Sequence, residues 1–67
     1  NMVVGEVYLS PAQCRERALL FEIGAVTQEA MEQDGHWILQ VRLPTYKWQQ
    51  LCELVPGIAT NWKQSNS

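Results

Sequence analysis

Eight residues of strict alternation constrain this fold more than any other part of the sequence. From His36 to Leu43 the chain reads HWILQVRL, and every second residue is large and apolar. A period of two predicts a β-strand with one buried face. Asp34-Gly35 comes directly before it and favours a two-residue hairpin turn in which both residues take positive φ. Because a hairpin needs a preceding partner, we assign a strand to residues 25–33, although their composition suits a strand or a helix.

The residues before this hairpin predict one more strand and a helix. Val3–Leu9 is rich in β-branched and aromatic residues, which are common in strands. Ser10 is a favourable helix cap, and Pro11 fits the first helical position. We therefore expect a helix from residue 11 to about residue 23, which Gly24 would end.

The residues after the hairpin predict a second helix, over Tyr46–Val55. Thr45 is its expected cap, and Pro56-Gly57 is its expected end. Its apolar residues recur at helical spacing and form one stripe. They are Trp48, Leu51, Cys52 and Val55. We expect an ordered core over about residues 3–58, whereas the polar residues 63–67 should fray.

Together these elements predict an α+β domain with the order β-α-β-β-α. A right-handed crossover makes the first two strands parallel, and the third strand then lies between them. The expected architecture is a truncated ferredoxin-like domain, in which a three-stranded sheet of order 1-3-2 has two helices on one face. Its other face, with Ile38, Val4 and Tyr8, should stay open. A chain of 67 residues is enough for one such domain.

Composition narrows the classes of partner. The formal net charge of −2 argues against a freestanding nucleic-acid binder, and we expect no DNA partner. No apolar run approaches about 18 residues, so we expect no membrane partner and a cytoplasmic location. Cys14 and Cys52 fall on the two helices and are interpreted as buried free thiols. The single His36 cannot complete a four-ligand zinc set with them.

Catalytic patterns are absent from the sequence. His36 would sit at a hairpin tip without a nucleophile, and we interpret it as an exposed residue beside the turn. The acidic residues nearby are interpreted as a solvated rim; they are Glu29, Glu32 and Asp34. There is no G-x-x-x-x-G-K-[ST] loop, so we expect neither enzyme activity nor a cofactor of its own. Arginine pairs can hold phosphate, and Arg15 and Arg17 are either such a pair or part of a solvated face.

Several motifs at these spacings resemble one known family. They are Arg15 and Arg17 in R-x-R, Ala25-Val26 entering the second strand, Met31-Glu32 before Asp34-Gly35, the run LQVRLP from Leu39 to Pro44, and Trp48 with Leu51-Cys52. Between about Cys14 and Pro56, the sequence resembles the C-terminal domain of the HflX family of ribosome-associated translational GTPases.

The resemblance implies a non-catalytic accessory domain, residues 1–67, excised from a larger GTPase. The parent protein would bind GTP and Mg²⁺ through a P-loop domain, and it would bind the large ribosomal subunit and split ribosomes. The expected partners are the parent GTPase domain and that subunit. Candidate polar contacts are Arg15, Arg17 and Arg42, and candidate contacts to a neighbouring domain are Tyr8 and Ile38. The alternative is a small-molecule-sensing regulatory domain that dimerises through its sheet.

Overall fold

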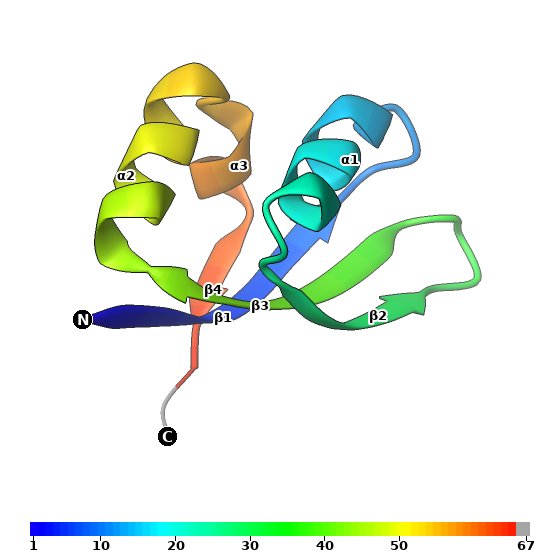
Figure 1. The fold of residues 1–67 in the computed structure, drawn as a ribbon. Helices are drawn as coiled ribbons and strands as arrows, with labels where there is room; N and C mark the ends of the chain where they lie inside the picture. The colour runs from blue at the N-terminus through cyan, green and yellow to red at the C-terminus, as the bar shows by residue number, and fades with distance from the viewer. Residues whose placement is uncertain (66–67) are drawn as a thin grey trace.

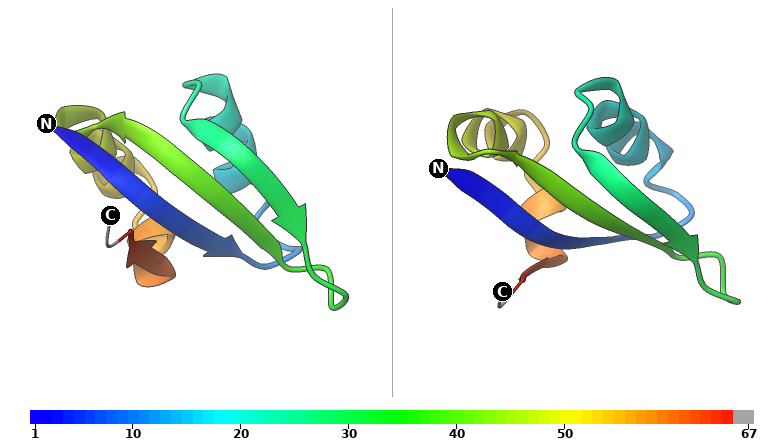
Figure 2. Two further views of the ribbon diagram at one scale, coloured as in Figure 1. Left: turned by 90° about the horizontal axis from the view of Figure 1, so that it is seen from below. Right: turned by 60° about the horizontal axis from the view of Figure 1, so that its bottom comes forward.

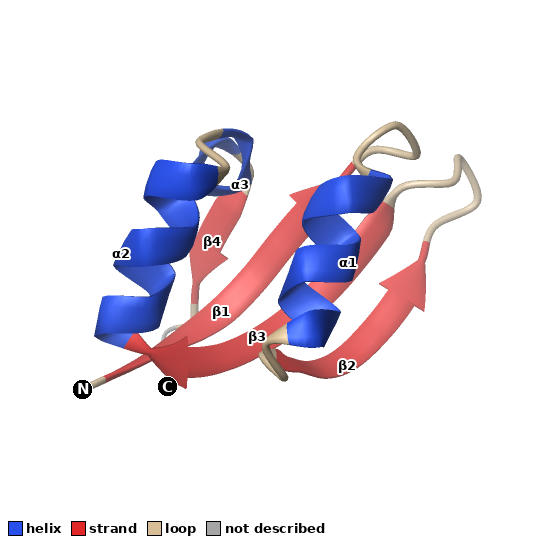
Figure 3. Ribbon diagram, turned by 45° about the horizontal axis from the view of Figure 1, so that its top comes forward, coloured by secondary structure: helices blue, strands red, loops and turns tan. Residues whose placement is uncertain are grey.

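Four strands and three helices form along residues 1–65, the part of the chain that this computed structural model describes (Figure 1). In chain order they are β1 (Met2–Leu9), α1 (Cys14–Glu22), β2 (Val26–Met31), β3 (Trp37–Pro44), α2 (Thr45–Leu54), α3 (Gly57–Thr60) and β4 (Trp62–Gln64). The strands form one layer, and the helices cover one face of it (Figure 3). Seen from the opposite side, the strands are not covered by any helix (Figure 2).

The sheet is antiparallel, with the order β2-β3-β1-β4. The predicted order 1-3-2 is present, but the prediction of three strands is wrong, because β4 pairs with β1 on its far side. Trp62 anchors this added strand: it lies opposite Val7, and its ring stacks on Trp48 with the centroids 4.5 Å apart. Two of the residues expected to fray, Lys63 and Gln64, therefore lie in a strand, while 66–67 lie outside the described residues. The α+β architecture is compatible with the ferredoxin-like prediction.

The core lies between the sheet and the helices. Its buried side chains are Val7, Leu9, Leu20, Ala25, Leu39, Val41, Leu43, Leu51 and Ile58. All of those that come from strands belong to β1 and β3, as the alternation in β3 predicts. Burying each large apolar side chain stabilises the fold by about 1.5–3 kcal/mol.

Helix α1 begins later than its capping sequence predicts. The backbone carbonyl of Ser10 accepts a hydrogen bond from the N–H of Gln13 at 3.0 Å, which makes a turn of residues 10–13. The Gln13 side chain reaches back and accepts the N–H of Ser10 at 2.9 Å. Ser10 and Pro11 therefore form a turn before the helix, and the helix itself starts at Cys14.

The hairpin loop is also longer than predicted. Met31 pairs with Trp37, and the N–H of Glu32 donates to the carbonyl of His36 at 2.8 Å. Of the two predicted turn residues, only Gly35 takes a positive φ, of 87°, so the prediction that Asp34 shares this conformation is wrong. Three-residue hairpin loops commonly end on such a left-handed glycine, and here the N–H of Gly35 donates back to the Glu32 carbonyl.

Candidate functional site

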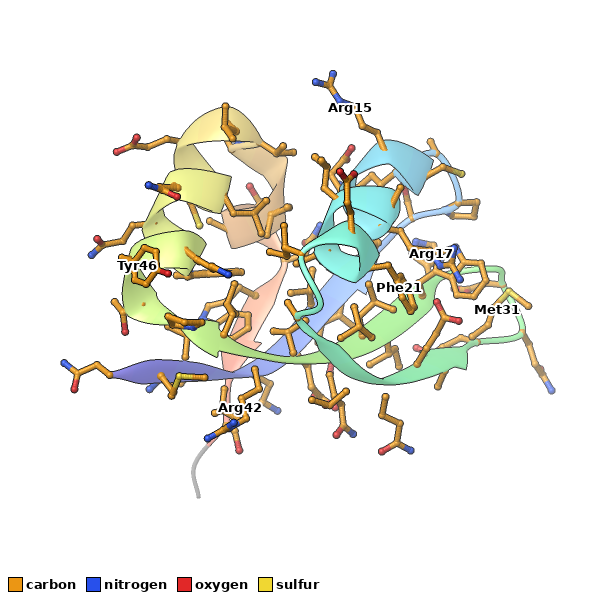
Figure 4. All side chains as sticks on the ribbon, viewed as in Figure 1. Arg15, Arg17, Phe21, Met31, Arg42 and Tyr46 are labelled. Carbon is orange, nitrogen blue, oxygen red and sulfur yellow. The ribbon has the colours of Figure 1, made fainter. Side chains whose placement is uncertain are left out.

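The candidate contact residues lie on opposite sides of the sheet. Arg15 and Arg17 belong to α1, which covers the core. Tyr8, Ile38 and Arg42 are on the open face, since they alternate with the core residues of β1 and β3. The side chains of Arg15 and Arg42 point away from each other on the two sides of the molecule (Figure 4). The structure thus defines two separate candidate surfaces.

Arg17 is held by its own domain. Its Nε lies 2.6 Å from Oε2 of Glu29, which is on β2. Its guanidinium lies over the rings of Trp37, at 4.2 Å from the centroid, and Phe21, at 4.8 Å. The hydrogen bond to Glu29 raises the pKa of Arg17 above its usual range. Glu29 is therefore bonded rather than part of a solvated rim, and Arg17 links α1 to β2 and β3.

Arg15 differs from Arg17 in having no ion-pair partner in the described part of the chain. It is exposed, and no ion pair joins it to any other residue among 1–65. Its side chain extends from α1 away from the sheet (Figure 4). The R-x-R motif thus contains one arginine bonded within the domain and one that is exposed.

Tyr8 and Ile38 are neighbours on the open face. They are cross-strand partners in the pairing of β1 with β3, and both side chains are half-buried. The Tyr8 hydroxyl donates to Oε1 of Glu6 at 3.0 Å. This hydrogen bond raises the pKa of Tyr8. The sequence-based placement of both residues on one open surface agrees with this geometry.

A hollow of about 380 Å³ lies beside these residues on the open face. Its charged lining residues are Glu6, Arg42 and Lys63, which come from three adjacent strands. Gln40 and Gln64 also line it. Lys63 is absent from the sequence-based candidates because its place depends on β4, which a polar tail does not predict.

A second, smaller hollow lies on the helical side, where the end of α1 meets α2. It has a volume of about 160 Å³ and is lined by Ile23, Leu51 and Leu54, with Lys47 and Gln50 at its rim. Leu54 is 77% exposed, more than any other large apolar side chain described. This is an apolar surface with one cation beside it.

The hairpin holds an Asp-His pair. Oδ1 of Asp34 accepts the backbone N–H of His36 at 3.0 Å, and Oδ2 lies 3.1 Å from Nδ1 of the same histidine. The backbone hydrogen bond is the main reason that the pKa of Asp34 is lowered. Both side chains are exposed, as predicted for residues beside a turn. Their bonds stabilise the turn.

The two cysteines differ in burial. Cys52 is half-buried, and burial raises the pKa of its thiol, but Cys14 is exposed, so its predicted burial is wrong. Cys14 lies at the start of α1, where its Sγ–H donates to the Pro11 carbonyl at 3.3 Å.

Within residues 1–65, no three His, Cys, Asp or Glu side chains come together as metal ligands. None of the described helices is both long and apolar enough to cross a membrane.

Comparison with known proteins gives one significant similarity to report. Over 50 residues, or 75% of this chain, the sequence is 38% identical to GTPase HflX of Escherichia coli strain K12. The chain spans only 12% of the length of that protein. No family model matches the sequence. The chain therefore contains a region related in sequence to HflX.

Proposed function

We propose that this chain is a non-catalytic accessory domain, the C-terminal domain of an HflX-like translational GTPase in the cytoplasm. The observation that carries the proposal is the 38% identity to GTPase HflX over 50 residues. The motifs that resemble the family fall on different elements of the fold, from α1 to α2. A similarity that covers 75% of the chain supports a shared domain rather than a shared short motif.

Catalysis belongs to another part of the parent protein in this proposal. The sequence lacks a P-loop, so GTP and Mg²⁺ would bind the GTPase domain and not this chain. A small domain can still contribute through its surfaces, which position it against that domain and against the large ribosomal subunit that the parent would bind and split. Function then lies in contacts rather than in a catalytic site.

We assign one of these contacts to the exposed side of α1 and the other to the open face of the sheet. Arg15, exposed and without an ion pair among residues 1–65, is our candidate for the ribosomal contact, because arginine binds phosphate bidentately. The open face with Tyr8, Ile38 and Arg42 is our candidate for docking on the GTPase domain. Arg17 acts indirectly, by holding α1 on the sheet through Glu29.

A domain exchange in E. coli HflX tests the proposal. One variant lacks the stretch that matches this chain, and a chimera carries this chain in its place. Co-sedimentation with purified large ribosomal subunits, in the presence of a GTP analogue, measures binding. We expect the deletion to weaken binding and the chimera to restore it.

Two results would contradict the proposal. If the deletion binds as tightly as the intact protein, the domain makes no ribosomal contact. If the chimera binds no better than the deletion, this chain does not share the function of the HflX region. In a chimera that binds, Arg15→Gln should lower affinity and flatten its salt dependence, because one phosphate contact is lost.

A further inference from the structure

We propose that the hollow on the open face binds an acidic protein segment, whose carboxylates pair with Arg42 and Lys63. The inference rests on the proposed function, in which the open face docks on a protein. It adds the chemistry of the partner: two carboxylates on one segment, with apolar contacts beside them.

The first argument is that neither cation has an ion-pair partner among the described residues. Arg42 and Lys63 are exposed, they line the same hollow, and neither forms an ion pair with any residue among 1–65. Arg17, by contrast, has a carboxylate at 2.6 Å within the domain. Within residues 1–65, the open face therefore has two positive charges that no carboxylate pairs with, and an external anion can bind them.

The second argument is the spacing of these cations. Arg42 lies opposite Val4 on one side of β1, and Lys63 lies opposite Glu6 on the other side. Their strands are separated by β1, and two strand spacings amount to about 10 Å. With their backbones this far apart, the two cations can each take a carboxylate of their own. Two acidic side chains in an extended segment, about 7 Å apart at positions i and i+2, reach toward both.

The third argument excludes a polyanion such as RNA. The Glu6 carboxylate lines the same hollow, and the Tyr8 hydroxyl holds it in place. Consecutive phosphates would meet this negative charge, whereas a peptide can offer it a backbone N–H or a neutral side chain. Sheets that bind RNA stack bases on two or three aromatic side chains, and here the described strands place only Tyr8 on the open face.

The surroundings of the hollow fit a peptide. The side-chain amide of Gln40, which alternates with the core residues of β3, offers hydrogen-bond donors to backbone carbonyls or carboxylates. Tyr8 and Ile38 form an apolar pair on the same face. Charged contacts flanked by apolar ones are typical of a protein interface.

The test measures binding of a fluorescein-labelled hexapeptide, with glutamates at positions i and i+2 and neutral residues elsewhere, to the 67-residue chain by fluorescence anisotropy at low salt. Arg42→Gln and Lys63→Gln should each weaken binding, and the double variant should lose about tenfold in affinity. Lys47→Gln is the matched control, because it removes one charge from an exposed lysine on the helical side. It should change affinity by less than about twofold. Thermal unfolding of each variant checks that its fold is intact.

Three results would overturn the inference: no saturable binding by the unmodified chain, an equal loss in Lys47→Gln, or tighter binding of an oligouridine of equal charge that also depends on Arg42 and Lys63. The last result would make the open face a nucleic-acid surface. Because the assay contains no ribosome and no GTPase domain, its failure leaves the domain exchange in HflX unaffected. Failure of that exchange equally leaves the peptide result standing.

Discussion

The two faces of this sheet are built by the same strands and differ in almost every property. On the covered face, Val7 and Leu39 are fully buried beneath the helices. On the open face, their chain neighbours Glu6 and Gln40 line a polar hollow. The covered face stabilises the fold, and the open face keeps charges that the fold does not use. In a domain this small, residues with no role in the core are the ones available for partners.

The largest expected effect on stability comes from removing a buried side chain from the covered face. Leu39 is fully buried in the central part of the sheet, so Leu39→Ala removes apolar contacts and leaves a cavity. We expect the free energy of unfolding to fall by about 2–5 kcal/mol, a large fraction of the stability of a small domain. Chemical denaturation measures it.

Gln40→Ala is the control, one residue further along β3 and on the open face. It should change stability by no more than about 0.5 kcal/mol, as for most surface substitutions. A loss in Gln40→Ala that matches the loss in Leu39→Ala would remove the distinction between the two faces.

The next effect tests how closely β4 lies against β1 at Gly5. A Cβ at Gly5 would lie 2.5 Å from Cη2 of Trp62 and would also collide with the backbone carbonyl of Lys63. Gly5→Ala should therefore displace β4 and lower the free energy of unfolding by about 1–3 kcal/mol. Gly57→Ala is the control, since the nearest atom to its Cβ would be at 3.7 Å. If Gly5→Ala is as well tolerated as Gly57→Ala, β4 does not pack on β1 as described.

A smaller effect separates the two arginines of α1. Arg17→Gln removes the ion pair to Glu29 and the contacts with two aromatic rings. The unfolding midpoint should fall by a few degrees. Arg15→Gln should leave it unchanged, because Arg15 has no ion pair among the described residues. Equal midpoints for the two variants would show that Arg17 does not hold α1 on the sheet.

The sequence predicts the part of the fold that depends on local periodicity. The alternation in β3 identifies its buried face, and the order of the central strands follows from connection rules. Strand β4 could not be predicted, because its position depends on tertiary contacts: the stacking of Trp62 on Trp48 and the space left by Gly5. A polar tail with one aromatic residue carries no periodic signal of its own.

The sequence predicts those candidate residues that lie in the regularly alternating strands β1 and β3. Tyr8, Ile38 and Arg42 share the open face because they alternate with core residues. The Arg17–Glu29 pair could not be predicted, because β2 contains an irregularity between Val26 and Gln28. Regular alternation would put Glu29 on the face opposite Val26. The one-residue shift brings it to the covered side, where Arg17 binds it.

The smallest expected effect concerns a single proton on the open face. The hydrogen bond from the Tyr8 hydroxyl to the Glu6 carboxylate raises the pKa of Tyr8 above its ordinary value of about 10. A group whose pKa is raised in the folded state adds stability that is fully present below its unfolded pKa. This stability is lost as the pH rises through the folded value. An NMR titration of the Tyr8 ring resonances measures the shift, and Glu6→Ala should return the pKa toward its ordinary value. If the pKa stays raised in Glu6→Ala, Glu6 is not its cause, and the hollow on the open face does not contain a carboxylate fixed by Tyr8.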